Sequence, residues 1–321
     1  MKESTIIMLR GIYKKIFQPP IEPLAPKCEE DKTLIQKLIK DKVLSGQPLM
    51  VARFGSIELT SLENAKNIRD HVSIWRYISW QGEPNYLKKR QAKALCNNAG
   101  FFPMPDEAMM MRFLSLHEKD MKEVDILGSW RYNEKYFANE LKNALKVDRE
   151  LMTPLLCEHP WTEALAGKRV LVVHPFASTI ESQYRNRDKL FPGTNILPEF
   201  TIMTMKAVQS QAGEETMFKN WFEALEYQKE EIDKYDYDIC LLGCGAYGFP
   251  LAAHCKRRGK QAIHLGGVLQ LLFGIKGKRW ETEDVYLNQY RYIDYYNEYW
   301  VRPSKDEVPH NAKSVENGCY W

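Results

Sequence analysis

Short apolar runs, each bounded by glycine or polar residues, recur along the chain and alternate with longer amphipathic stretches. Uninterrupted apolar runs are typical of strands buried on both faces of a parallel sheet, whereas apolar residues spaced three and four apart indicate covering helices. The pattern therefore predicts an α/β, Rossmann-like fold with a mostly parallel sheet and helices on both faces. The runs that predict strands are Leu49 to Phe54, Lys168 to Phe176, Phe200 to Val208, Ile239 to Leu242 and Gln261 to Leu265.

Helical spacing of apolar residues is clear in three segments between these runs. It extends over Lys32 to Leu44, over Glu214 to Lys234 and over about Phe249 to Arg258. Residues from about 65 to 165 are also mostly helical in pattern, with weak strand character around Val124 to Gly128. We therefore expect a largely helical insertion at about 65–165.

The first 30 residues differ in pattern from the rest. Apolar residues alternate with basic ones in the opening segment MKESTIIMLRGIYKKIF, and the proline-rich QPPIEPLAP follows it. A basic amphipathic helix of this kind suits an anionic membrane surface, and a terminal helix packed on its own domain is the alternative. We expect an N-terminal amphipathic segment and linker over 1–30, then a single α/β domain over 31–321. The domain ends in a tail rich in aromatic residues, which either folds over the site or wraps the domain.

Composition and charge narrow the class of protein. Acidic and basic residues are well mixed and the net charge is only +3, so we expect no nucleic acid as a partner. The seven cysteines are scattered without metal-finger spacing, which is typical of a reducing cytoplasm. No apolar run approaches the ~20 residues that cross a bilayer, and the start lacks a secretory cleavage pattern. A cytoplasmic protein is the expectation.

Glycines follow the apolar run that begins at Ile239, and they spell Gly-x-Gly-x-x-Gly where a helix should begin. Glycines there permit positive φ and close backbone approach, while the N–H groups of the next helix face an anion. The pattern predicts a nucleotide-phosphate site, and tight helix-on-strand packing is the alternative role for these glycines. The residues expected to surround the nucleotide are Gly243, Gly245, Ala246, Tyr247, Gly248, His264, Gly266, Gly267 and Gln270.

The acid of a dinucleotide-binding unit is missing here. Such a unit has Asp or Glu about 20 residues after its glycines, where it holds the ribose hydroxyls. His264 occupies that place. This disfavours a dehydrogenase, but an NAD(P)- or S-adenosylmethionine-dependent Rossmann enzyme and a non-catalytic nucleotide-binding protein stay open as alternatives. Lys276 and Arg279 lie just downstream and suit a diphosphate, with a solvated basic loop as the alternative.

Polar side chains also end two other predicted strands. The sequence RFGSIE at 53–58 follows the first strand, and His174 ends a later one. Ligands of an open parallel sheet gather at the carboxyl ends of its strands, so both are site candidates. Each also has a structural interpretation: Glu58 as an acid at a helix start, Arg53 as an ion-pair partner and His174 as a core histidine.

These two glycine-bearing strand ends carry a resemblance to a known family. With RFGSIE at one and GCGAYGFPLAAHCKRRGKQAIHLGG at the other, the chain resembles the GT-D-fold glycosyltransferases, a Rossmann-like group of bacterial sugar transferases. The resemblance covers mainly residues 48–62 and 236–274. It does not extend to residues 65–165 or to the tail.

The first motif can be compared position by position. Arg53, Phe54 and Gly55 match the start of the family's Arg-Phe-Gly-Asp-x-Glu stretch and Glu58 matches its last acid, whereas Ser56 stands in place of the Asp. In the family this acid pair is associated with the sugar-nucleotide diphosphate and a divalent ion, Mn²⁺ or Mg²⁺. The resemblance therefore leaves two expectations. Either Glu58 holds the ion with the diphosphate and water, or Arg53 and helix N-termini stabilise the leaving nucleotide without metal.

The resemblance implies a glycosyltransferase of bacterial surface or capsular polysaccharide assembly, with a nucleotide sugar as donor and a glycan or lipid-linked acceptor. This chemistry needs a diphosphate cradle, a positive stabiliser and often a base. We expect the glycine turns as the cradle, Arg53 or Lys276 with Arg279 as the stabiliser, and Glu58 or His174 as the base. Lipid-linked acceptors sit at the inner membrane face, where the N-terminal segment offers a peripheral contact.

Overall fold

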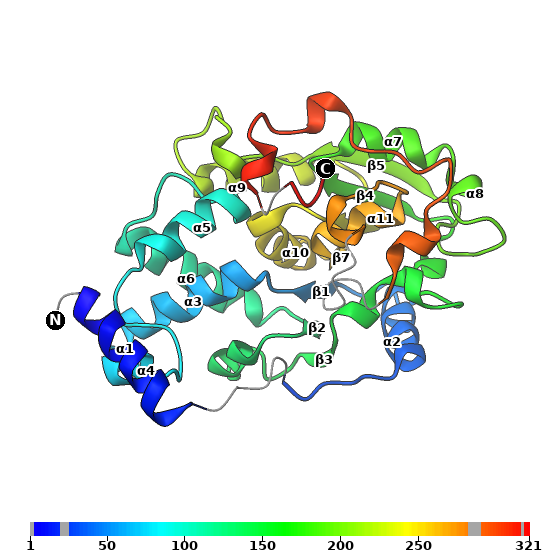
Figure 1. Cartoon of the computed structure of the whole chain (residues 1–321). Helices are drawn as coiled ribbons and strands as arrows, with labels where there is room; N and C mark the ends of the chain where they lie inside the picture. The colour runs from blue at the N-terminus through cyan, green and yellow to red at the C-terminus, as the bar shows by residue number, and fades with distance from the viewer. Residues whose placement is uncertain (1–2, 20–25, 282–289, 316–317) are drawn as a thin grey trace.

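The computed structural model describes residues 3–19, 26–281, 290–315 and 318–321. Among these, seven strands form one sheet in the order β3-β2-β1-β7-β6-β4-β5, and every neighbouring pair is parallel (Figure 1). The predicted α/β, Rossmann-like fold is confirmed. The strands are β1 (Leu49–Arg53), β2 (Ile126–Ser129), β3 (Leu145–Asp148), β4 (Arg169–His174), β5 (Thr201–Lys206), β6 (Ile239–Leu242) and β7 (Gln261–His264).

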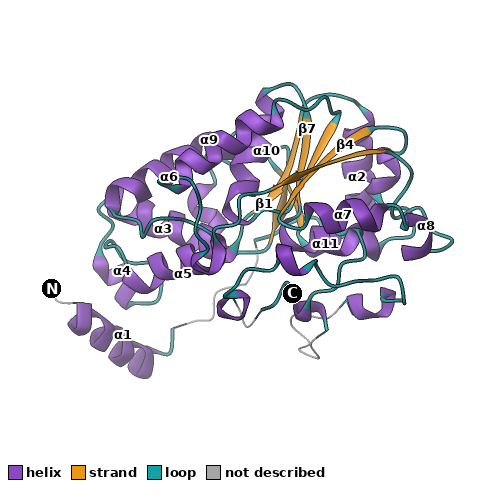
Figure 2. Ribbon diagram, turned by 90° about the horizontal axis from the view of Figure 1, so that it is seen from above, coloured by secondary structure: helices purple, strands orange, loops and turns teal. Residues whose placement is uncertain are grey.

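Helices cover both faces of the sheet (Figure 2). Successive strand residues point to opposite faces, so that Val172 belongs to one apolar core and its neighbours Leu171 and Val173 to the other. Helices α2, α7 and α11 contribute to the first core, and α3, α5, α6, α9 and α10 to the second. The helices are α1 (Glu3–Phe17), α2 (Lys32–Leu44), α3 (Ser56–Arg69), α4 (Ile74–Ile78), α5 (Lys89–Ala99), α6 (Glu107–Met121), α7 (Ala177–Tyr184), α8 (Arg187–Leu190), α9 (Trp221–Ile232), α10 (Gly248–Arg257) and α11 (Leu269–Leu272).

The segment expected to be a helical insertion also builds part of the sheet. The end of α3 and helices α4 to α6 occupy its first part, but β2 and β3 follow and extend the sheet beyond β1. The pattern indicates β2 weakly and does not indicate β3. The reason is that β3 is an edge strand in which Val147 is buried while Leu145 is 49% exposed, so no apolar run marks it.

Helix α9 begins seven residues later than the predicted start at Glu214. Its first residue is Trp221, and the Asn220 side chain caps it by accepting a hydrogen bond of 3.0 Å from the Glu223 N–H. Asparagine is a favoured cap because its side chain replaces one of the missing partners of the first helical turn. The prediction of a helix from Glu214 was therefore wrong at its N-terminal end.

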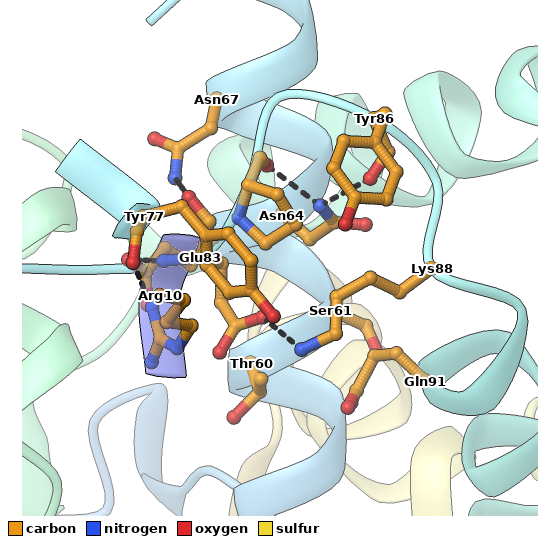
Figure 3. A network of polar contacts seen from close by, with 12 residues as sticks. Arg10, Thr60, Ser61, Asn64, Asn67, Tyr77, Glu83, Tyr86, Lys88 and Gln91 are labelled. Atoms are coloured by element: carbon orange, nitrogen blue, oxygen red, sulfur yellow. Dashed lines mark hydrogen bonds and ion pairs between the residues drawn. The ribbon is translucent and has the colours of Figure 1, made fainter. Parts of the chain in front are cut away.

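The N-terminal helix α1 packs on the domain. Ile6 is buried against Tyr77 and Ile78, and the guanidinium carbon of Arg10 lies 4.0 Å from the ring centroids of both Tyr77 and Trp80. Figure 3 shows Arg10 beside Tyr77. Nearby, the Asn64 side chain donates hydrogen bonds to the carbonyls of Pro84 and Tyr86 and so holds the loop that follows α4. The proline-rich linker lies largely outside the described residues. Within those residues, no helix combines the length and the apolar content needed to cross a membrane.

The start of α9 can be tested by replacing its cap. We predict that Asn220→Ala lowers the free energy of unfolding by about 1 kcal/mol, measured by urea denaturation, because a backbone N–H loses its partner. Glu215→Ala, at an exposed position before the helix, is the matched control and should change stability little. If the helix began at Glu214, Asn220 would be interior and alanine would stabilise it.

Candidate functional site

A cavity of about 470 Å³ lies at the carboxyl ends of β1, β4, β6 and β7. The neighbouring strands β4 and β6 lead into helices on opposite faces of the sheet. Helix α7, which follows β4, packs in one apolar core, and α10, which follows β6, packs in the other. Connections that diverge in this way leave a crevice at the strand ends, which is where ligands of open α/β sheets bind. The position of the cavity is therefore the one expected for a binding site.

Four arginines line this cavity, against one acidic side chain, Glu58, among its described lining residues. Arg53 ends β1, Arg131 follows β2 by two residues and Arg149 directly follows β3. Arg279 comes from the segment after α11. Because β1, β2 and β3 are adjacent, three of these cations come from neighbouring strand ends. Arg149 is paired with Glu150, and the remaining positive charge favours an anionic ligand.

Arg53 is half-buried and is held by the backbone. Its Nη1 donates to the Phe54 carbonyl at 3.1 Å and its Nε to the Leu265 carbonyl at 3.4 Å. Burial, together with the charges of Arg149 and Arg279, lowers the pKa of Arg53, but a guanidinium stays charged in proteins. In the described part of the chain, no carboxylate forms an ion pair with it. Within these residues the charge of Arg53 is therefore not neutralised by an ion pair, although Tyr320 and Glu58 lie near enough to raise its pKa in part.

The second glycine pair makes room for side chains of this site. A Cβ added to Gly266 would lie 1.8 Å from Nη2 of Arg53, and φ at this position is +68°. A Cβ added to Gly267 would lie 2.3 Å from the Tyr320 ring. The pair is therefore needed so that Arg53 and Tyr320 can reach the cavity, in addition to any contact its backbone makes with a ligand.

The glycines after β6 have a similar role. A Cβ on Gly243 would lie 2.5 Å from Cδ2 of His174, and one on Gly248 would lie 2.2 Å from Cε1 of His264. The space above both glycines is thus filled by imidazole rings. Tight packing, the alternative that the sequence leaves open, accounts for these two positions. Gly243 still lines the cavity through its backbone, whereas Gly248 does not.

His174 is a poor candidate for the base. Its Nδ1 accepts a hydrogen bond of 3.0 Å from the Phe176 N–H, so the proton of the neutral ring is on Nε2. Burial lowers the pKa of His174 to about 3, so the ring also resists taking a second proton. A base needs an accepting atom, and the remaining nitrogen donates. This geometry favours a role for His174 as a hydrogen-bond donor, and its expected role as a base stays an untested prediction.

His264 has the opposite tautomer. Its Nδ1 lies 3.2 Å from the Leu242 carbonyl, which can only accept, so Nδ1 carries the proton and Nε2 is an acceptor. Burial, assisted by the nearby charge of Arg53, lowers the pKa of His264 to about 3. The cavity wall therefore contains two neutral imidazoles with complementary hydrogen-bonding roles.

Glu58 lies in the first turn of α3, with its carboxylate folded over Gly55. A Cβ on Gly55 would lie 1.9 Å from Oε2 of Glu58. The charged side chains around it on the cavity wall are arginines, and no group of three or more His, Cys, Asp or Glu placed to hold a metal is found in the described residues. Over the described part of the chain, one acidic side chain among guanidinium groups does not fit Mn²⁺ or Mg²⁺, which prefer several oxygen ligands.

Most residues expected at the site are brought together in this cavity, and four are not. The Phe54 side chain is buried and stacks on Phe249, with ring centroids 4.5 Å apart. Ala246 and Gly248 are buried away from the cavity, and Lys276 lies with Nζ 5.7 Å from the Tyr296 ring centroid. The expected residues that line the cavity are Arg53, Gly55, Ser56, Glu58, His174, Gly243, Gly245, Tyr247, His264, Gly266, Gly267, Gln270 and Arg279.

Other lining residues were not expected from the sequence. Trp130 and Arg131 follow the weakly indicated β2, so the strand-end rule alone could have found them. Arg149 follows the unpredicted β3, and its guanidinium carbon lies 4.2 Å from the Trp130 ring centroid. Tyr320 and Trp321 reach the cavity from the tail. No local pattern connects them with the sheet.

Comparisons of this chain with protein-family models, curated proteins and solved structures found no match. The resemblance to the GT-D-fold glycosyltransferases therefore stays a prediction that depends on two motifs.

The role of Gly266 can be tested against a matched glycine. We predict that Gly266→Ala weakens binding of inorganic pyrophosphate by about tenfold in calorimetry, because the new Cβ displaces a charged hydrogen-bond donor, Arg53. The control is Gly259→Ala, because Gly259 also has a positive φ, of +77°, but an added Cβ there would have no other atom within 4 Å. Both replacements should cost about 1 kcal/mol of stability for their positive φ. Equal pyrophosphate affinities in the two variants would contradict the assigned role.

Proposed function

We propose that this protein is a glycosyltransferase that uses a nucleotide-diphosphate sugar as its donor. The observation that carries the proposal is the guanidinium of Arg53, enclosed by the fold without a carboxylate ion pair in the described residues and grouped with Arg149 and Arg279. A group of arginines binds phosphate oxygens strongly and provides the charge that a departing diphosphate requires. The RFGSIE motif, which contributes Arg53 and Glu58, adds the resemblance to sugar transferases.

In the proposed reaction the bond between the anomeric carbon and the phosphate oxygen breaks, and its electron pair leaves with the nucleoside diphosphate. A hydroxyl oxygen of the acceptor forms the new bond to the anomeric carbon. Glu58 takes the proton of that hydroxyl, since it is the acidic side chain among the described lining residues. The arginines stabilise the negative charge that grows on the leaving group. Each role in this reaction is therefore assigned to a side chain of the protein itself.

The alternatives receive less support from the same cavity. S-adenosylmethionine is a cation, which four arginines would repel. A dinucleotide would suit the arginines, but the glycine motif gives it no support, because His264 stands where the acid of that motif belongs and its ring packs on Gly248. A non-catalytic nucleotide-binding protein would bind its ligand through the same arginines. Only an assay for turnover of the nucleotide sugar distinguishes it from a transferase.

The proposed function predicts a dependence on Arg53. Among UDP-, GDP- and other nucleotide sugars, NAD(P) and S-adenosylmethionine, we expect stabilisation in thermal-shift assays by a nucleotide sugar, together with its turnover in the presence of a glycan acceptor. Arg53→Ala should lower kcat/KM by about 100-fold. Arg185→Ala, which removes an exposed arginine directly after α7, is the control and should have no effect. Binding of NAD(P) alone would contradict the proposal.

We also propose that α1 rests on an anionic membrane, which would bring the site to a lipid-linked acceptor. The helix is fixed through Arg10, while Met8, Ile12 and Ile16 are 57%, 45% and 64% exposed at i, i+4 and i+8. Lys14 and Lys15 lie in its last turn. An exposed apolar stripe beside basic residues fits the surface of an anionic bilayer.

This membrane contact can be tested by vesicle flotation. We predict that Ile12→Glu combined with Ile16→Glu abolishes flotation with vesicles containing phosphatidylserine, because it places charge in the apolar stripe. Met217→Glu, at another exposed apolar position, is the matched control and should float like the unchanged protein. Equal flotation of both variants would show that α1 does not carry the contact.

A further inference from the structure

A second, smaller cavity of about 240 Å³ adjoins the first. The two share Arg53, Arg149 and Arg279 as lining residues. The arginines therefore lie where the cavities meet. A diphosphate bound by them would place its two substituents, the sugar and the nucleoside, in different cavities.

The chemistry decides which substituent belongs to which cavity. Glu58, His174 and His264 line the larger cavity and not the smaller one. Glu58 must face the acceptor at the anomeric carbon, so the sugar belongs in the larger cavity. That cavity, at about 470 Å³ against about 240 Å³, also has to accommodate the acceptor. The smaller cavity is left for the nucleoside.

Asp148, at the end of β3, lines the smaller cavity, and one of its two carboxylate oxygens accepts no hydrogen bond from the described residues. Its Oδ1 accepts from the N–H groups of Glu150 and Leu151 at 2.8 and 3.1 Å. Over the described ranges of the chain, no hydrogen bond reaches Oδ2. Glu150 is already engaged, with Oε1 accepting from the Tyr292 hydroxyl and Oε2 paired with Arg149. Asp148 is therefore the carboxylate of this cavity that a ligand can use.

Apolar side chains complete the smaller cavity. Leu265, Val268 and Trp280 line it on the side of β7 and the segment that follows. A carboxylate that ends a strand, next to a diphosphate site, is the arrangement by which α/β sheets hold ribose hydroxyls, and an apolar wall suits the flat base. The position differs from the one the sequence suggested, because the acid is the last residue of β3 and does not lie at the end of β7.

We propose that the smaller cavity binds the nucleoside of the donor, with Asp148 accepting hydrogen bonds from the ribose hydroxyls. This inference rests on the proposed function, since it takes the anion at the arginines to be the diphosphate of a nucleotide. It adds a nucleoside subsite and a ribose-binding residue.

The test is a binding cycle on the full-length protein by calorimetry, with UDP or GDP, the corresponding 2′,3′-dideoxynucleotide and inorganic pyrophosphate as probes. We expect Asp148→Asn to weaken the ribonucleotide by about tenfold and to leave pyrophosphate unchanged, because it removes the charge from a hydrogen bond. The same substitution should leave the affinity for the dideoxynucleotide unchanged, because that probe lacks the ribose hydroxyls. Asp188→Asn, which changes an exposed carboxylate, is the control.

The outcomes separate this inference from the proposed function. If Asp148→Asn binds the ribonucleotide as tightly as the unchanged protein, the nucleoside lies elsewhere and the subsite is wrong, while binding lost in Arg53→Ala would still support the transferase. If the variant weakens pyrophosphate equally, its effect is on the arginines and the ribose role is wrong. If neither ribonucleotide binds the unchanged protein, the subsite and the proposed function fall together.

Discussion

The site depends on a cation that the fold encloses without a carboxylate partner in the described residues. Two backbone carbonyls, of Phe54 and Leu265, hold the guanidinium of Arg53 in place. Enclosing a charge with incomplete compensation costs free energy, and the neighbouring charges of Arg149 and Arg279 add repulsion. An anion bound between these groups would relieve both costs. The arrangement is therefore explained most simply by a ligand that carries several negative charges.

Glycines make this arrangement sterically feasible. The absent side chain of Gly266 leaves room for Arg53, and that of Gly248 leaves room for His264. Glycine sequences after strands are usually interpreted as phosphate cradles, since the backbone can then approach the ligand. Here the same residues first allow side chains from other strands to converge on the cavity. The anion would consequently be held by guanidinium groups to a greater extent than by a glycine turn.

Much of the fold could be predicted from the sequence, because buried parallel strands leave uninterrupted apolar runs, such as the one that forms β6. The edge strand β3 leaves no such run, since Leu145 is half exposed. Because β3 was not predicted, neither its last residue, Asp148, nor the following Arg149 was expected at the site. The start of α9 was displaced because an asparagine cap interrupts the helix where apolar spacing continues. For the site, strand-end residues such as Arg53 and Glu58 were found, whereas Tyr320 was not. Its place in the cavity is set by tertiary contacts with Gly267 and Arg279, which no local pattern encodes.

The central claim is that the charge of Arg53 is reserved for a diphosphate. A crystal structure of the protein with a bound nucleoside diphosphate tests it most directly. The account predicts diphosphate oxygens within hydrogen-bond distance of the guanidinium groups of Arg53, Arg149 and Arg279, at the junction of the two cavities. A diphosphate held instead by backbone N–H groups of the Gly243 to Gly248 turn, with Arg53 out of contact, would contradict it.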